Sequence, residues 1–147
     1  MADSHNASQL RDYVASRAHG YCEYCRHHES FSTDPFSVEH VVPKCRGGAS
    51  SADNLAYSCQ GCNNIKYTRI AATDPETGQD VALYNPRIDK WSSHFQWDDD
   101  ALRIVGITSV GRATVDALKL NRQGIVNLRW ALFLLGLHPP DTPDAID

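Results

Sequence analysis

The chain has 147 residues, of which 41% are hydrophobic and 22% are charged. This composition is typical of a soluble globular protein that is long enough to bury a core without disulfide bonds. No apolar run approaches the roughly 20 residues of a membrane-spanning helix, so no membrane span is predicted. The formal net charge of −4 excludes a strongly basic DNA clamp, although it permits nucleic-acid binding at a local surface.

The N-terminal residues lack the basic and apolar stretches of a signal peptide, which predicts a cytoplasmic protein. The five cysteines are an odd number, so disulfides within the chain cannot pair them all. Four of them form two Cys-x-x-Cys pairs, Cys22 with Cys25 and Cys59 with Cys62. In a reducing compartment this arrangement favours a bound metal over disulfides. Cys45 is left without a predicted role.

The N-terminal segment predicts a helix over residues 8–19. Leu10 and Val14 recur on one face of this segment, and Gly20 suits the position that follows a helix. The first cysteine pair follows in a tight knuckle over residues 21–30.

The next segment predicts two strands and a helix. Residues 36–42 and 55–58 have the pattern of strands, and the loop over 44–54 is rich in glycine and serine. A helix is expected to begin within the second cysteine pair, at 59–62, and to run to about residue 72.

The second half of the chain predicts a turn, a hairpin and two helices. The turn covers residues 74–79, and the hairpin strands cover 94–97 and 102–107. The helices are expected over 108–120 and 123–135. The residues expected to form their core face are Leu118, Leu120, Ile125, Leu128, Ala131, Leu132 and Leu135.

The two cysteine pairs can supply the four ligands of a tetrahedral zinc site, each pair from one tight turn. Residues 26–58 lie between the pairs, which is more than a zinc finger usually contains, so another structure must be folded inside the gap. The sequence therefore predicts structural Zn²⁺ at Cys22, Cys25, Cys59 and Cys62. A zinc ribbon without activity is the simplest structure that meets this pattern.

The inserted segment carries an ordered series of motifs, which are Glu39-His40, Gly47-Gly48, Asp53-Asn54-Leu55 and Cys59-Gln-Gly-Cys62-Asn63-Asn64-Ile-Lys66. Together they resemble the HNH endonuclease family, whose ββα-metal fold sets a hairpin against a helix. The resemblance covers residues 22–66. It rests on an acid–histidine pair, a glycine-rich loop, an Asn-Leu pair and the start of the helix after the second cysteine pair.

The resemblance implies a role for each polar residue of the site. His40 is the implied general base, since a neutral imidazole near physiological pH can take a proton from water. Glu39 is implied to be an acidic metal ligand. Asn63 occupies the family's final histidine position, which makes the sequence an HNN variant, and its amide oxygen suits Mg²⁺ or Mn²⁺. Asn54 is implied to brace the loop and to orient His40.

Two features of the sequence depart from the simplest form of that site. Glu39 and His40 point to opposite faces of a regular strand, so both serve one site only if the strand bends or twists. Glu39 stands where many members of the family have Asp, and Asn63 replaces an imidazole. The first change adds a methylene, and the second weakens the case for softer metals.

Four basic residues of the segment are candidates for contact with phosphate, namely Lys66, Arg69, Lys44 and Arg46. Lys66 lies three residues after Asn63 and close to the same helix face. Solvated surface charge is the alternative for the other three. The expected partner is nucleic acid, with DNA favoured over RNA, and no membrane.

The sequence thus predicts an α+β fold within a single domain over 1–147. A zinc-stapled ββα-metal nuclease core with its N-terminal helix occupies 8–72, a C-terminal extension of a hairpin plus helices occupies 73–140, and 141–147 form a flexible tail. The predicted function is metal-dependent hydrolysis of phosphodiester bonds. The alternatives are a non-catalytic zinc module that binds nucleic acid or protein, and an HNH scaffold that has lost its activity.

Overall fold

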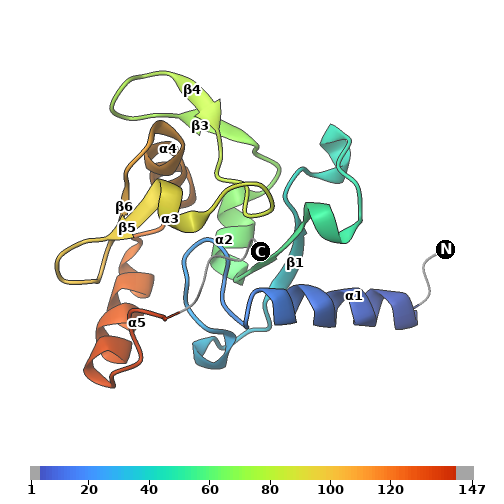
Figure 1. Ribbon diagram of the computed structural model, residues 1–147, viewed down its shortest axis with the longest axis horizontal. Coiled ribbons are helices and arrows are strands. Elements are labelled where there is room, and N and C mark those ends of the chain that lie inside the picture. Colours follow the sequence, from blue (N-terminus) through green and yellow to red (C-terminus); the bar gives the residue numbers. More distant parts are fainter. Residues whose placement is uncertain (1–3, 142–147) are drawn as a thin grey trace.

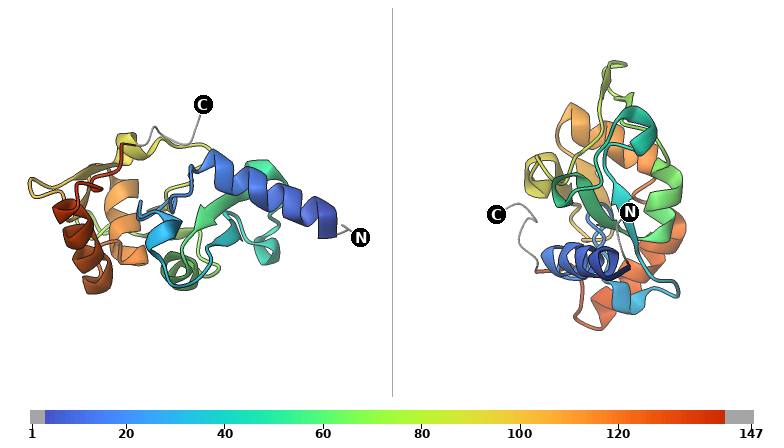
Figure 2. Two further views of the ribbon diagram at one scale, coloured as in Figure 1. Left: turned by 90° about the horizontal axis from the view of Figure 1, so that it is seen from below. Right: turned by 90° about the vertical axis from the view of Figure 1, so that its right-hand side faces the viewer.

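The computed structural model describes residues 4–141, and the predicted tail falls outside the described residues except for Asp141. Within that range the structure combines helices with three two-stranded antiparallel sheets (Figure 1). The predicted α+β class is therefore confirmed. The N-terminal helix α1 and the C-terminal helix α5 lie at opposite ends of the molecule (Figure 2).

The first helix, α1 (Ser4–Arg17), begins and ends slightly earlier than predicted. Val14 is fully buried on its inner face. Gly20 has a φ of 77° and its amide donates to the carbonyl of Ala15 at 3.0 Å, which ends the helix. The Arg17 guanidinium in the last turn donates to the backbone carbonyls of Ala52 and Leu55 and thereby attaches α1 to the start of β2.

The central unit is a hairpin followed at once by a helix. Strands β1 (Ser37–His40) and β2 (Leu55–Ser58) pair antiparallel, with His40 opposite Leu55. Helix α2 (Gln60–Lys66) follows β2 after one residue and packs against β1. The long connection between the strands contains the 3-10 turns Lys44–Arg46 and Ala52–Asn54. This is the predicted order of two strands and a helix.

Helix α2 is shorter than predicted, because it ends at Lys66 and not near residue 72. Tyr67 adopts a φ of 51° and a ψ of −119°, which no helix can continue through. The chain then forms an unpredicted hairpin of β3 (Ala71–Thr73) and β4 (Asp80–Ala82) around the predicted turn. Arg112 fixes that turn by donating to both carboxylate oxygens of the buried Asp74.

The C-terminal half forms the predicted hairpin and the two helices after it, and a short helix that was not predicted, which includes His94, precedes the hairpin. Its elements in chain order are α3 (Trp91–His94), β5 (Phe95–Trp97), β6 (Ile104–Gly106), α4 (Ser109–Leu118) and α5 (Gln123–Leu134). Thr108 caps α4 by accepting the Gly111 amide at 3.0 Å. Gly111 also lets α4 approach the end of α3, because a Cβ there would lie 2.0 Å from the His94 carbonyl oxygen.

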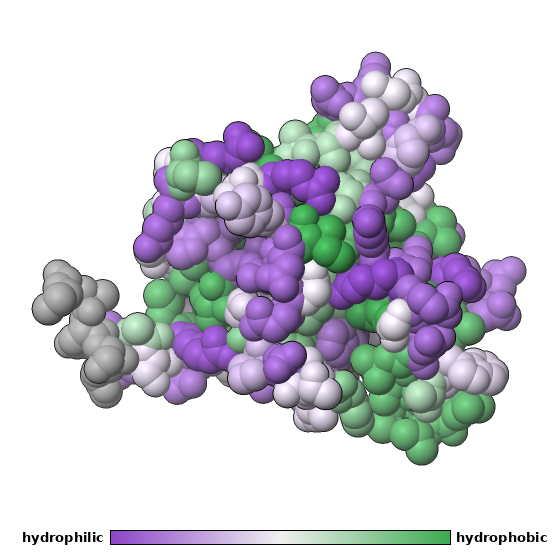
Figure 3. All heavy atoms as spheres, turned by 180° about the vertical axis from the view of Figure 1, so that it is seen from behind, coloured by the Kyte–Doolittle hydropathy of each residue, from purple (hydrophilic) through white to green (hydrophobic). Residues whose placement is uncertain are grey.

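The core runs from α1 through the hairpin into the C-terminal half and includes the four paired cysteines and the ring cluster of Tyr84, Trp91 and Phe95. Most of the predicted core residues of α4 and α5 are buried or partly buried. Ala131 and Leu135 are exceptions, and Leu135 is 70% exposed. The outer side of α5 faces solvent, and apolar residues gather there (Figure 3). The exposed apolar residues in and after α5 are Trp130, Phe133, Leu134, Leu135 and Leu137.

None of the helices within residues 4–141 combines the length and the apolar character needed to cross a membrane.

Candidate functional site

The four paired cysteines converge on one point inside the protein. Their Sγ atoms all lie within 4.8 Å of one another, and the side chains are buried. The Sγ atoms of Cys25 and Cys59 are 3.7 Å apart. Zn–S bonds of about 2.3 Å in a tetrahedron place neighbouring sulfurs about 3.8 Å apart. The donor set therefore fits zinc, and four cysteines leave no ligand position open for catalysis.

Local backbone structure brings each pair together. The first knuckle closes where the Cys22 amide donates to the His27 carbonyl and the Arg26 amide donates to the Cys22 carbonyl, both at 3.0 Å. Cys59 is the N-cap of α2, and its sulfur accepts the Cys62 amide at 3.4 Å. A spacing of three residues at the start of a helix places both thiols on one side.

Two arginines from the C-terminal half contact the cysteine cluster. Arg122, the N-cap of α5, places a guanidinium nitrogen 3.6 Å from the sulfurs of both Cys59 and Cys62. Burial acts against its charge, but the neighbouring Cys62 and Cys25 thiolates outweigh that effect and raise the pKa of Arg122. The buried Arg129 donates to the Cys25 carbonyl at 3.3 Å. These contacts supply positive charge beside a cluster of four sulfurs.

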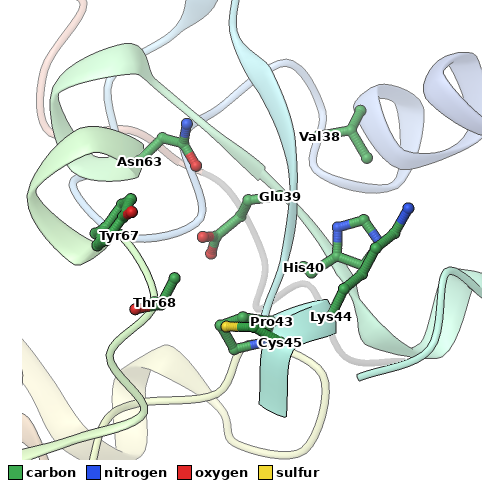
Figure 4. A pocket seen from close by; sticks show the side chains of 9 residues that line it. All are labelled: Val38, Glu39, His40, Pro43, Lys44, Cys45, Asn63, Tyr67 and Thr68. Atoms are coloured by element: carbon green, nitrogen blue, oxygen red, sulfur yellow. The ribbon is translucent and has the colours of Figure 1, made fainter. Parts of the chain in front are cut away.

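A separate, open cavity of about 340 Å³ lies at the end of β1. Four residues predicted for the site line it, namely Glu39, His40, Lys44 and Asn63. The other residues of its wall, shown in Figure 4, are Val38, Pro43, Cys45, Tyr67 and Thr68. The cavity thus combines residues from β1, from the loop that follows and from α2.

Glu39 points from β1 towards α2 (Figure 4), and the residue is only 5% exposed. The Tyr24 hydroxyl donates to Oε1 of Glu39, and Nζ of Lys66 lies 3.5 Å from Oε2. Burial raises the pKa of Glu39 to about 7, although Lys66 and Tyr24 act to lower it. Near neutral pH this carboxyl group is therefore poised between its charged and uncharged forms.

Lys66 is only 1% exposed. Its ammonium donates to the Val41 carbonyl at 2.9 Å and faces Glu39. A phosphate in solvent cannot reach it in this position, so the expectation that Lys66 contacts nucleic acid does not agree with the structure. The reason is that α2 lies directly against β1, which turns this face of the helix inward.

His40 lies on the other side of β1 from Glu39 (Figure 4), so β1 lacks the bend that would turn both side chains to one point, and the two residues border the cavity from opposite sides of the strand. Its Nε2 forms a hydrogen bond of 2.9 Å with the Ser50 hydroxyl. Partial burial and the nearby Lys44 ammonium lower the pKa of His40. Both effects disfavour the imidazolium, so the ring is held in the neutral form that can accept a proton.

Asn54 fastens the loop that follows His40. Its amide oxygen accepts the Val42 amide at 3.0 Å, and its amide nitrogen donates to the carbonyls of Val42 and Ala49 at 2.9 and 2.8 Å. Gly48 must be glycine here, because a Cβ would lie 1.7 Å from the Val42 carbonyl oxygen. The predicted glycine-rich loop is therefore folded back onto the end of β1.

Residues 22–69, which carry both cysteine pairs, the hairpin and α2, match the family model described as HNH endonuclease. The chain contains an HNH domain. No curated protein and no solved structure matches the chain. The HNH domain supports a nuclease-type function, a nucleic-acid substrate and metal binding at the four cysteines. The matched segment ends before β3, so the C-terminal half lies outside it.

Asn63 of the HNH domain is half-buried, and it lines the cavity from α2 together with Glu39 from β1. Carboxylate and amide oxygens are the donors that Mg²⁺ and Mn²⁺ prefer. The two side chains therefore offer a donor set that fits a hard divalent cation. This set differs in kind from the four sulfurs of the cysteine cluster.

The other predicted basic residues differ in how freely they face solvent. Lys44 and Arg46 are exposed beside the cavity, and Nε of Arg46 donates to the Thr68 carbonyl at 2.6 Å. Arg69 is half-buried and turns a guanidinium nitrogen to the carbonyls of Ile65 and Ala117. Lys44 and Arg46 are thus the better placed of the four to meet a phosphate.

The sequence did not indicate Tyr24 or Arg122 as parts of these sites. Tyr24 lies inside the first cysteine pair and meets Glu39 fifteen positions later, and Arg122 lies 60 positions from Cys62. Neither has a local motif. The only sequence feature that could have indicated Tyr24 is its position between two paired cysteines. Its contact with Glu39 can be recognised only in the folded chain, where the hairpin lies beside the knuckle.

Proposed function

We propose that the HNH domain is a metal-dependent endonuclease that hydrolyses phosphodiester bonds in DNA. One observation carries the proposal. His40, Glu39 and Asn63, the general base and the two cation ligands that the HNH resemblance implies, line one open cavity. Because that cavity is open to solvent, the backbone of a duplex can reach it without the extrusion of a base.

His40 is the proposed general base. With its pKa lowered by burial and by Lys44, its imidazole is neutral near pH 7 and can take a proton from an attacking water. The Ser50 hydroxyl, 2.9 Å from Nε2, fixes the plane of the ring. Asn54 contributes indirectly, since it holds the loop next to the end of β1 on which His40 sits. Proton transfer by a positioned base typically contributes about 10²- to 10⁴-fold in rate.

Glu39 and Asn63 are the residues that would hold Mg²⁺ or Mn²⁺. When bound there, such a cation supplies positive charge to the phosphate oxygens as negative charge develops on them. Tyr24 and Lys66 favour the anionic form of Glu39, which is the form that binds a cation. Lys44 and Arg46 are proposed to contact phosphates on either side of the bond that is cut.

The zinc cluster is proposed to be structural and to require reduced thiols, which agrees with a reducing compartment such as the cytoplasm. We further propose that the whole chain acts as one domain. Buried residues such as Val14, Tyr57, Trp91 and Leu118 belong to one core cluster, and Arg122 and Arg129 attach α5 to the cysteine knuckles.

A plasmid-nicking assay tests the enzyme. Zinc-loaded wild type and His40→Ala are incubated with supercoiled DNA and Mg²⁺, Mn²⁺ or EDTA, with His19→Ala as the matched control, because His19 is exposed and does not line the cavity. We expect nicking by wild type and His19→Ala that EDTA abolishes. His40→Ala is expected to lose about 10²- to 10⁴-fold in rate while its zinc content is unchanged.

The other outcomes separate the alternatives. If zinc-loaded wild type cuts neither plasmid, branched DNA nor RNA, the enzyme is excluded and a non-catalytic zinc module remains. Cleavage of RNA alone would keep the chemistry and change the substrate. Nicking that survives in His40→Ala would remove His40 from the role of base.

A further inference from the structure

Both residues between the first two cysteines point into the protein. Glu23 and Tyr24 are each 1% exposed, although residues in tight turns usually face solvent. Glu23 accepts the Tyr57 amide of β2 at 2.8 Å and pairs with Arg87. Tyr24 directs its hydroxyl to Glu39 of β1. The zinc knuckle therefore contacts both strands of the HNH hairpin through buried polar side chains.

Contacts of the Tyr24 ring and of the Tyr24 backbone fix the position of its hydroxyl group. Its ring meets the ring of Tyr84 edge to face, at 6.2 Å between centroids. Its backbone carbonyl accepts a hydrogen bond from the Trp91 indole at 3.2 Å. The neighbouring Cys22 and Cys25 belong to the buried cysteine cluster, whose four sulfur atoms lie within 4.8 Å of one another. With the ring, the backbone and the flanking residues all constrained, the hydroxyl has little freedom to leave Glu39.

Glu39 in turn is fixed by two donors from different elements. Tyr24 donates to one carboxylate oxygen, and the Lys66 ammonium of α2 lies 3.5 Å from the other. An ionised carboxylate has about four lone-pair positions, so two donors leave room for a cation. Lys66 is itself anchored by the Val41 carbonyl. The carboxylate is thus oriented before any cation arrives.

We propose that Tyr24 is a positioning residue that orients Glu39 for a hard divalent cation and thereby connects the structural zinc knuckle to the nuclease cavity. This inference rests on the proposed function, because it takes Glu39 as a ligand of that cation. The order of dependence is physical: zinc fixes the knuckle, the knuckle fixes Tyr24, and Tyr24 fixes Glu39. The zinc site then does more than stabilise the fold, since it sets the geometry of the second metal site.

The test measures cation binding directly, without relying on cleavage. Mn²⁺ is titrated into the zinc-loaded full chain, and free Mn²⁺ is followed by electron paramagnetic resonance. Wild type is compared with Tyr24→Phe and with the matched control Tyr57→Phe, which removes the hydroxyl of another tyrosine with a buried ring. Outer-shell partners typically contribute about 10- to 100-fold to metal affinity. We expect a Kd for Mn²⁺ at least about tenfold higher in Tyr24→Phe, no change in Tyr57→Phe, and equal zinc content in all three.

A second measurement needs no variant that removes the hydroxyl. 3-Fluorotyrosine is introduced at position 24 alone, and its ¹⁹F resonance is followed while Mg²⁺ is added. Because the hydroxyl bonds to the carboxylate that receives the cation, we expect a saturable shift of the resonance. The same label at position 57 is expected to remain unchanged.

The outcomes distinguish this inference from the proposed function. Equal Mn²⁺ affinity in wild type and Tyr24→Phe, or a ¹⁹F resonance at position 24 that Mg²⁺ does not move, overturns the role of Tyr24 and leaves the nuclease standing. Failure of wild type to bind Mn²⁺ overturns the proposed cation site, and this inference with it.

Discussion

The cysteine cluster and the open cavity at the end of β1 are two candidate metal sites built on one short helix. Cys59 and Cys62 stand at the start of α2, and the next residue, Asn63, lines the cavity. The cluster offers four sulfurs in the buried core. The cavity is lined by a carboxyl, an amide and an imidazole side chain and is open to solvent. A closed set of four soft ligands holds an ion permanently, whereas an open set of hard ligands lets a cation and a substrate enter.

Negative charge is compensated differently at the two sites. The thiolates are met by Arg122, whose charge does not depend on pH in the physiological range. Glu39 faces Lys66 and a neutral hydroxyl, and burial raises its pKa to about 7 although both partners act to lower it. A divalent cation beside Glu39, as proposed, would favour the ionised form of this carboxyl group. The comparison predicts that stability depends on the cluster and chemistry on the cavity.

The largest effect is expected on removal of the zinc. Cys59→Ala should lose zinc and with it the native fold of the HNH domain, because structural Zn²⁺ in zinc-finger peptides contributes about 10–16 kcal/mol. Bound zinc is measured by elemental analysis and the fold by near-ultraviolet circular dichroism. Cys45→Ala, which removes the exposed thiol, is the control and should keep both. A native spectrum from zinc-free Cys59→Ala would show that the cluster is dispensable for folding.

The next largest effect is expected at the loop beside His40. Asn54→Ala removes three hydrogen bonds to the backbone of Val42 and Ala49, of which the one to Ala49 is exposed. Each hydrogen bond typically contributes about 0.5–1.5 kcal/mol, so we expect a loss of about 2–3 kcal/mol in the free energy of unfolding, measured with urea. Nicking should fall as well, because the loop no longer holds its place at the end of β1.

Asn64→Ala is the control for that measurement, since Asn64 is exposed on α2. Exposed substitutions usually change stability by no more than about 0.5 kcal/mol. If Asn54→Ala unfolds at the same urea concentration as wild type, then the loop does not depend on the amide, and the role implied for the middle asparagine is lost.

The two sites also differ in how far the sequence reveals them. The cysteine cluster could be predicted from the spacing of Cys22, Cys25, Cys59 and Cys62, because each pair closes within one turn, and the structure confirms that the two pairs converge. Asn54 and its partners in the loop are at most twelve residues apart in the sequence, so these contacts can be predicted from a local motif. The strands and the order of elements around them agree with the structure for the same reason.

The contacts that sequence reasoning missed are those between distant elements. Lys66 lies near Asn63 on α2, as predicted, but it is buried and not exposed to a phosphate. Its burial results from the packing of α2 on β1, which the local sequence does not reveal. The end of α2 depends on the backbone of Tyr67, and the β3–β4 hairpin that follows has no strong strand pattern in Ala71–Thr73. Tyr24 and Arg122 acquire partners only in the folded chain.

A smaller effect sharpens the comparison at the zinc site. Arg122→Met removes the guanidinium beside the sulfurs of Cys59 and Cys62 but keeps all four ligands. The zinc should stay bound and the fold should be retained, while release to a coloured chelator in the presence of a thiol reagent becomes about tenfold faster. Arg103→Met is the control, because Arg103 is exposed in another part of the chain. Equal release from the two variants would mean that Arg122 does not stabilise the thiolates.

The smallest effect concerns the pH at which the cavity becomes active. The Lys44 ammonium helps to lower the pKa of His40, so Lys44→Gln should raise that pKa towards its ordinary value. The base must be neutral to accept a proton, and the acid limb of kcat/KM should therefore move to higher pH. The displacement should be small and should shrink as salt is added, because Lys44 is exposed and its charge is screened.

Arg46→Gln separates this effect from weaker substrate binding. Arg46 is exposed beside the same cavity but does not contribute to the pKa shift of His40. The Arg46→Gln substitution should lower kcat/KM by the same factor at every pH and leave the acid limb of the profile in place. A limb that moves equally in both variants would assign the shift to the loss of phosphate contacts. If the acid limb moves to higher pH only in Lys44→Gln, the charge of Lys44 helps to set the pH at which His40 can accept a proton. The cysteine cluster has no such dependence, because the guanidinium beside it stays charged throughout this pH range.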